Sequence, residues 1–345
     1  MPLIGCICAI VFPPWDGIWA WIKPLPDSVQ EQVDDAISHG LDGIIVYVGK
    51  KGEPPAFYTA GWKNREEKIP TDQHSPFKIA SIDKLYVAVA ITKLVNDQRL
   101  SLDSTLADHF PALEQSIQNA DLITIRMMLQ HRSGIPNFTD VAGYWQEPPE
   151  NQEAALQLIH GLPADFEAGS DYRYSNSNYL LLTKVIEEVV GYGHFQYIAE
   201  EILIPLGLTN TYDSMNDVEI ADMTSGYWVG YGPDLKHRFY GSMVATAEDV
   251  GVFLMALNDG TLLDSTEQSI YRSVYEYGHS GLVPGYQSVA RYHSDIDTVV
   301  VQFVNTSGGT PIFPIFDTGG GTKVMVANVV YNRIVQILRN SEQAD

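Results

Sequence analysis

The feature that most constrains this fold is the stretch from Ser81 to Val95, which is apolar on nearly every face of a helix. A helix lying on a protein surface carries polar residues along one side. This stretch instead has apolar side chains all round: Ile82, Leu85, Val87, Ala88, Val89, Ile91, Leu94 and Val95. It predicts a helix buried inside the molecule, and a chain of 345 residues is long enough for two domains or one large intertwined one.

Strand patterns lie towards both ends of the chain, and helical patterns lie between them. Short apolar or alternating runs at 43–48 and 56–62 predict one hairpin, and runs at 285–292 and 298–305 predict another. Helical spacing is found in seven further segments: 27–39, 125–130, 151–160, 178–190, 196–204, 246–257 and 323–339. The sheet-forming ends therefore bracket a helical middle.

Composition excludes several classes of function. With 43 acidic residues against 21 Lys and Arg, the formal net charge of −22 disfavours nucleic acid and anionic membranes as partners. The only cysteines, Cys6 and Cys8, are too close together for an ordinary disulfide or a four-ligand zinc site. No two histidines lie within four residues of each other, so the sequence predicts neither a metal nor another cofactor.

The N-terminal segment, residues 1–26, is apolar and then rich in proline. The run from Leu3 to Phe12 is shorter than the ~20 residues that a membrane span needs. It resembles the core of a signal peptide without the preceding positive segment, and Leu3-Ile4-Gly5-Cys6 resembles a lipoprotein processing site. These patterns favour an extracytoplasmic, secreted or membrane-anchored protein, and the alternative is a buried apolar arm.

Two Ser-x-x-Lys elements occur close together, at Ser75–Lys78 and Ser81–Lys84. Residues three apart share one face of a helix, so Ser81 and Lys84 can meet, whereas Ser75 precedes a proline and an extended segment. Burial of Lys84 should lower its pKa and make it a base for the Ser81 hydroxyl. The alternative is a capping serine followed by a lysine that reaches out to water.

Two further elements carry candidate site residues. Tyr174-Ser175-Asn176 precedes the helix expected from residue 178, where Tyr174 can carry a proton and Asn176 can offer its amide to Lys84 and a substrate carbonyl, although Ser and Asn also cap helices. His279-Ser280-Gly281 begins an edge-like strand, where Gly281 would let a substrate backbone approach closely. A polar turn is the alternative there, and Leu282 breaks the G-x-S-x-G pattern of a nucleophile elbow.

Taken in this order, the three elements resemble the serine β-lactamase and penicillin-binding protein superfamily, in its class C-like branch. Segments 77–80, 123–136 and 241–249 add to the resemblance, which runs from about residue 27 to 339. It implies an α+β fold: an antiparallel sheet flanked by helices, with an inserted all-helical subdomain. A catalytic domain is then expected at 27–345, its α/β part at about 27–80 and 240–345 and its helical part at about 81–239.

The resemblance also implies a mechanism and a range of substrates. Ser81 would form an acyl-enzyme with proton transfer through Lys84 and Tyr174, and the amides of Ser81 and Leu282 would bind the oxyanion. His279 replaces the lysine usual in β-lactamases, so we rank a D-Ala-D-Ala carboxypeptidase-like peptidase first, a carboxylesterase second and a β-lactamase third. A protonated His279 could meet a substrate carboxylate. A non-catalytic sensor that binds penicillin or peptidoglycan peptides is the alternative from another class.

Overall fold

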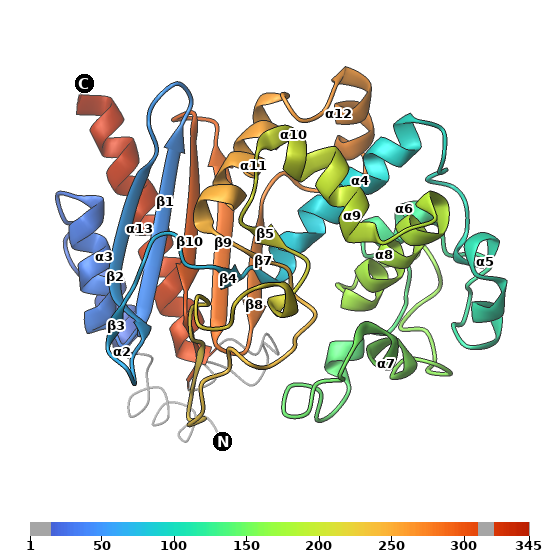
Figure 1. Cartoon of the computed structure of the whole chain (residues 1–345), viewed down its shortest axis with the longest axis horizontal. Coiled ribbons are helices and arrows are strands. Elements are labelled where there is room, and N and C mark those ends of the chain that lie inside the picture. The colour runs from blue at the N-terminus through green and yellow to red at the C-terminus, as the bar shows by residue number, and fades with distance from the viewer. Residues whose placement is uncertain (1–14, 310–320, 345) are drawn as a thin grey trace, which may run out of the picture.

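The computed structural model describes residues 15–309 and 321–344, and its centre is a six-stranded antiparallel sheet (Figure 1). The strand order is β3-β2-β1-β10-β9-β8, so strands from the two ends of the chain pair side by side. Their bounds are β1 (Gly43–Lys50), β2 (Ala56–Asn64), β3 (Ile69–Pro70), β8 (His279–Val283), β9 (Tyr286–His293) and β10 (Thr298–Val304). Both predicted hairpins are confirmed.

Two small sheets lie beside the main one. A three-stranded antiparallel sheet joins β4 (Phe77–Lys78), β7 (Val244–Ala245) and β5 (Thr211–Tyr212). A parallel pair joins β6 (Tyr227–Val229) and β11 (Thr306–Gly308). Both bring the middle of the chain against the sheet, and β4 leads directly into the segment that carries Ser81.

The helices are α2 (Trp15–Ile22), α3 (Val29–Ser38), α4 (Asp83–Asn96), α5 (Leu106–His109), α6 (Ile125–Leu129), α7 (Gln152–Gln157), α8 (Asn176–Val190), α9 (His194–Ile198), α10 (Ile204–Leu206), α11 (Ala247–Asp259), α12 (Ser265–Arg272) and α13 (Gly321–Ala344). Short 3-10 turns lie at Ala80–Ile82, Pro111–Gln115, Phe138–Asp140 and Met215–Asp217. Helices α5 to α9 form a group beside the edge of the sheet that ends in β8 (Figure 1).

Side-chain alternation along the strands separates two cores. On β1, Ile44 and Val46 pack with α3 and α13, while Ile45 and Tyr47 face the core that contains α4 and α11. Because successive strand residues point to opposite sides, β1 and its neighbour β10 are apolar at nearly every position. The fold class is confirmed: an antiparallel sheet is flanked by helices on both faces.

The buried helix predicted from residue 81 is confirmed as α4, in which every residue from Lys84 to Thr92 is buried. Other boundaries differ from expectation. Helix α8 begins at Asn176 rather than 178, and the single helix expected at 196–204 is a succession of α9, a π-helical turn (Ala199–Leu203) and α10. Pro205 has no backbone N–H to continue a regular helix, which is consistent with this interruption.

Two expectations from the sequence are not tested by the structure. The apolar run at residues 3–12 lies outside the described residues, and the domain boundaries stay predictions. In the described parts of the chain, no helix combines the length and the apolar character that crossing a bilayer requires.

Candidate active site

Ser81 lies on a tight turn between β4 and α4. The preceding residue, Ala80, has a φ of +50°, a conformation that residues other than glycine seldom adopt. Two buried serines hold this turn: the Ala80 N–H donates to Ser242 Oγ at 2.8 Å, and Ser288 Oγ donates to the Ile79 carbonyl at 2.7 Å. The turn is thereby fixed from both sides, as a positioned nucleophile requires.

Lys84 and Tyr174 converge on the Ser81 hydroxyl. Lys84 Nζ lies 3.2 Å from Ser81 Oγ, and the Tyr174 hydroxyl donates to the same oxygen at 2.8 Å. Lys84 Nζ also lies 5.4 Å from the centre of the Tyr174 ring. Three candidates from two separate sequence elements therefore share one hydrogen-bonded cluster, which is the arrangement of a nucleophile with two groups that can move its proton.

The expected protonation of Lys84 is wrong. Burial alone would lower the pKa of its ammonium, but the Tyr174 oxygen and the Asp83 carboxylate reverse this effect and raise that pKa above its usual value. Asp83 Oδ1 lies 3.8 Å from Lys84 Nζ. Asp83 directly precedes Lys84 in the sequence, so helical spacing of three or four residues does not indicate this pair. This direction of the pKa shift favours the charged form of Lys84 and argues against a neutral amine as the base for Ser81.

His131 packs against Tyr174 and was missed as a site residue, although its segment contributed to the family resemblance. Its ring centre lies 4.3 Å from that of Tyr174, and its Nδ1 accepts a hydrogen bond from the Ser175 N–H at 3.2 Å. Burial, followed by the charges of Lys84 and His279, lowers the pKa of His131 to about 3. A neutral ring therefore packs against Tyr174. The available sequence signal was the Ser133-Gly134 pair that follows it, and the structure shows a left-handed turn at His131, with a φ of +56°.

Asn176 begins α8 at the edge of the cleft, but its amide does not bind Lys84 as expected. Its Nδ2 donates to Asn137 Oδ1 at 3.3 Å and to Thr139 Oγ1 at 3.2 Å, and its backbone N–H also donates to Asn137 Oδ1. Asn176 therefore ties the start of α8 to the segment at residues 137–139.

Strand β8 carries the remaining candidates, His279, Ser280, Gly281 and Leu282, along the edge of the main sheet. The structure gives a further reason for glycine at position 281. A Cβ atom there would clash with the Ile79 carbonyl oxygen and with Ala80 Cβ. The glycine lets β8 pack directly against the turn that holds Ser81, and close approach of a substrate backbone stays a prediction.

His279 is buried between polar partners at the start of β8. Its Nδ1 donates to the Ser280 carbonyl at 2.6 Å, while its Nε2 lies 3.3 Å from Glu276 Oε1. Burial, followed by the charge of Lys84, lowers the pKa of His279 to about 4. The neutral ring beside a carboxylate carries no net positive charge, and protonation would only form an ion pair with Glu276.

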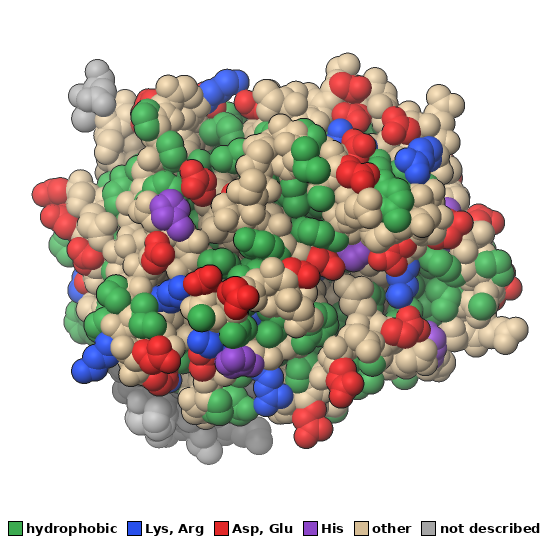
Figure 2. All heavy atoms as spheres, in the orientation of Figure 1, with side chains coloured by type: hydrophobic (Ala, Val, Ile, Leu, Met, Phe, Trp, Pro, Cys, Tyr) green, Lys and Arg blue, Asp and Glu red, His purple; other side chains and the backbone are tan. Residues whose placement is uncertain are grey.

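All eight predicted site residues line one cleft of about 1420 Å³. The acidic residues in its lining are Asp83, Asp140, Glu153, Glu187 and Asp213. The cations there are Lys84 and Arg173, and Arg173 is paired with Asp140 and Asp165 at 3.1 and 2.8 Å. Acidic side chains are likewise spread over the face in Figure 2 rather than gathered in one patch. Among the described residues, no three His, Cys, Asp or Glu side chains are grouped to hold a metal ion.

Comparison with known proteins agrees with this geometry. Residues 21–276 match the family model described as Beta-lactamase. The chain belongs to the beta-lactamase family. This is a family of serine hydrolases that share the beta-lactamase fold, and the resemblance inferred from the three sequence elements is confirmed.

Two curated relatives of this beta-lactamase family member are bacterial. Protein flp of Staphylococcus aureus (strain MRSA252) is 27% identical over 211 residues, which cover 59% of this chain and 42% of flp, so this chain spans less than half of that relative. The PbpX protein of Bacillus subtilis (strain 168), whose name describes a penicillin-binding protein, is 26% identical over 291 residues, or 77% of this chain and 71% of PbpX.

Solved structures show the same fold. The D-amino acid amidase from Ochrobactrum anthropi SV3 complexed with D-phenylalanine has a TM-score of 0.80 at 22% identity, covering 92% of this chain and 100% of that chain. The penicillin-binding protein from Bacillus halodurans has a TM-score of 0.73 at 24% identity, covering 90% and 99%. At such identities the likeness concerns the fold alone.

Proposed function

We propose that this protein hydrolyses an amide bond through an acyl-enzyme on Ser81. The observation that carries the proposal is the convergence of Lys84 Nζ and the Tyr174 hydroxyl on Ser81 Oγ, at 3.2 and 2.8 Å. A serine hydroxyl is a weak nucleophile until a neighbouring group can take its proton. Both neighbours here are fixed by buried contacts, in a cleft large enough for a peptide or a comparable small molecule.

The proposed reaction has two halves. Ser81 Oγ attacks the carbonyl carbon while its proton passes to the Tyr174 oxygen beside Lys84. Tyr174 must first release to water the proton that it donates to Ser81 Oγ in the structure. The carbonyl electron pair moves onto the oxygen, where the amides of Ser81 and Leu282 would donate to it. Collapse of this intermediate breaks the C–N bond, and the departing nitrogen takes the proton from Tyr174. Water then attacks the ester by the same route and releases the acid and free Ser81.

The charge of the cleft favours a substrate without a carboxylate on its leaving group. His279, the residue expected to meet such a carboxylate, has Glu276 3.3 Å from its Nε2 and a pKa lowered to about 4. The other cation besides Lys84 in the described lining, Arg173, is already paired. We therefore favour an amidase or a peptidase that cleaves an uncharged amide. The D-Ala-D-Ala carboxypeptidase, which the sequence motifs favoured first, becomes the second candidate.

The test compares intact protein with Ser81→Ala on two matched peptides, acyl-D-Ala-D-Ala and the same peptide with a C-terminal amide. Labelling by a fluorophosphonate and by a fluorescent penicillin is followed in parallel. We expect labelling and hydrolysis to depend on Ser81, with loss of at least about 10³-fold in the alanine variant. We also expect the amidated peptide to be cleaved faster than the free acid.

Each other outcome points to a different function. Faster cleavage of the free acid would support the carboxypeptidase, ester turnover alone would support an esterase, and turnover of the penicillin would support a β-lactamase. A non-catalytic sensor should keep its affinity for peptide or penicillin in Ser81→Ala. Absence of both labelling and turnover would exclude the catalytic proposal. An extracytoplasmic location remains part of the proposal and rests on the N-terminal sequence alone.

A further inference from the structure

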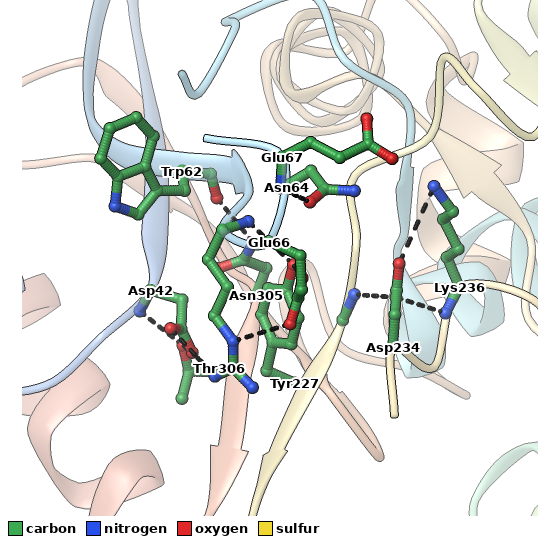
Figure 3. Close-up of polar contacts among 12 residues, drawn as sticks. Asp42, Trp62, Asn64, Glu66, Glu67, Tyr227, Asp234, Lys236, Asn305 and Thr306 are labelled. Atoms are coloured by element: carbon green, nitrogen blue, oxygen red, sulfur yellow. Dashed lines mark hydrogen bonds and ion pairs between the residues drawn. The ribbon is translucent and has the colours of Figure 1, made fainter. Parts of the chain in front are cut away.

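Segment 226–240 forms a closed loop at the cleft, and its backbone is fastened at the base. Asp234 Oδ1 accepts hydrogen bonds from the N–H groups of Gly226 and Lys236 at 3.0 and 2.9 Å (Figure 3). The Leu235 N–H also donates to the Gly226 carbonyl at 2.9 Å. One carboxylate thereby joins the start of the loop to a point ten residues later.

The outer side of this loop is held by a polar cluster around Tyr227. The Tyr227 hydroxyl donates to Glu66 Oε2 at 2.6 Å and accepts from the Arg65 N–H at 2.9 Å (Figure 3). The Arg65 guanidinium lies 3.9 Å from the centre of the Tyr227 ring and pairs with Asp42 at 3.1 Å. These contacts tie the loop to the main sheet on the side away from Ser81.

The inner side of the loop is held by Lys78, the lysine of the first Ser-x-x-Lys element. Its Nζ donates to the carbonyl oxygens of Leu235, Lys236 and Arg238 at 3.1, 2.9 and 2.6 Å. An ammonium has three N–H groups, so each one has a partner on the same short stretch of backbone. Lys78 is only 2% exposed, and no carboxylate of the described residues lies within 4 Å of its Nζ.

Such a lysine is a poor source of stability. Burial, only partly offset by the charge of Asp234, lowers the pKa of Lys78 to about 7, which shows that the charged form is disfavoured in the folded protein. A buried charge without an acidic partner costs free energy that an apolar side chain of the same size would not. The position of Lys78 therefore points to a role in arranging the loop.

The loop ends at the cleft in an aromatic wall, which we define as Phe138, Tyr144, Trp145 and Tyr240. The ring centres of Tyr240 and Trp145 are 6.0 Å apart, those of Trp145 and Tyr144 4.8 Å, and those of Tyr144 and Phe138 5.4 Å. All four residues line the cleft that contains Ser81. Lys78 Nζ lies 5.2 Å from the Tyr240 ring centre, so it contacts the wall as well as the loop backbone.

We propose that Lys78 is a positioning residue for substrate binding: by holding the loop carbonyls it places Tyr240 in the aromatic wall, and the wall binds an apolar part of the acyl group. This inference rests on the proposed hydrolysis at Ser81 and adds to it the class of acyl group that the cleft takes. Aromatic side chains offer large apolar surfaces at low entropic cost, which suits them to such a site.

The test measures kcat and KM for p-nitrophenyl acetate and p-nitrophenyl octanoate with intact protein and with Lys78→Met. Octanoate carries an extended apolar chain that the wall could bind, whereas acetate carries only a methyl group. We expect Lys78→Met to raise KM for octanoate by about tenfold or more, the effect of losing hydrogen bonds to a charged group, with kcat changed by less than about threefold. Acetate kinetics should change by less than about twofold, within the usual range for distant substitutions.

Four further variants separate positioning from general damage. Tyr240→Ala should reproduce the KM effect, and the double variant should be no worse than either single one, because both changes remove the same wall. Lys78→Arg should recover part of the octanoate affinity, since a guanidinium can still donate to the carbonyls. Lys51→Met, at an exposed lysine outside the cleft lining, is the matched control and should match the intact protein.

Hydrogen exchange provides a readout that does not depend on activity. Lys78→Met should increase exchange of the amides in segment 226–240 and leave those of α13 unchanged. Unchanged exchange in that segment would overturn the proposal even if no ester were cleaved. Equal losses for acetate and octanoate, or additive effects of Lys78→Met and Tyr240→Ala, would overturn it too. Failure of intact protein to label at Ser81 would count against the proposed hydrolysis alone.

Discussion

The two Ser-x-x-Lys regions of this molecule have the same spacing and opposite outcomes. Ser81 and Lys84 lie on a 3-10 turn and the first turn of α4, and their side chains meet at 3.2 Å. Ser75 and Lys78 lie on an extended segment ending in β4, and Lys78 reaches instead to carbonyls some 157 to 160 residues away in the sequence. Spacing alone therefore does not make a site, because the backbone conformation decides which side chains share a face.

The surroundings of the two lysines differ as much as their geometry. Both are buried, yet the pKa of Lys84 is raised because Tyr174 and Asp83 outweigh burial, whereas the pKa of Lys78 is lowered to about 7 because burial dominates. The shift favours the charged form of Lys84 beside the nucleophile. Lys78 is held by neutral carbonyl groups and can lose its proton near neutrality.

Replacing Lys84 by Met should give the largest contrast with Lys78→Met. Loss of a group that assists proton transfer typically costs about 10²–10⁴-fold in rate. We expect kcat of Lys84→Met to fall by that factor on p-nitrophenyl acetate, while Lys78→Met retains kcat. Stopped-flow measurement of acylation together with circular dichroism would check this on folded protein. Similar kcat losses in both variants would remove the distinction between the two elements.

The sequence anticipated the parts of this contrast that depend on local structure. The apolar stretch from Ser81 predicted a buried helix, and helical spacing then brought Lys84 to Ser81. The charge state of Lys84 was not accessible in this way, because it depends on how Asp83 and Tyr174 are buried together. The partners of Lys78 could not be found either, since they are backbone atoms of a distant loop. The close neighbour of Gly281 could not be found from the sequence either, because it is the Ile79 carbonyl, about 200 residues earlier in the chain.

A smaller effect is expected on how the free energy of unfolding depends on pH, and it should come from Lys78 rather than from Lys84. Unfolded lysine has a pKa of about 10.4, whereas that of Lys78 in the folded protein is lowered to about 7. Between these values the unfolded chain binds more protons, so stability rises with pH from about 7 to 10.4. The gain is a few kcal/mol at most, since each unit of pKa corresponds to about 1.4 kcal/mol.

This gain should be present in the intact protein and absent in Lys78→Met. Urea unfolding at a series of pH values would measure it as the difference between the two proteins, which cancels groups that titrate in both. If the free energy of unfolding of the intact protein and of Lys78→Met changes with pH in the same way, Lys78 keeps an ordinary pKa in the folded state. Lys78 and Lys84 would then differ in geometry alone.

The smallest effect is expected from Ser75→Ala, the counterpart of Ser81→Ala in the other element. The Ser75 hydroxyl is buried, and no hydrogen-bond partner for its Oγ is found in the described part of the structure. Removing a buried hydroxyl that makes no hydrogen bond relieves a desolvation cost, so the free energy of unfolding should change by no more than about 1 kcal/mol, towards greater stability. Fluorophosphonate labelling and ester hydrolysis should match those of the intact protein, because Ser75 lies outside the cleft lining. Reduced labelling in a folded Ser75→Ala protein would mean that the first element contributes to the chemistry. A short distance between a serine and the lysine three residues later would then not be enough to identify the nucleophile.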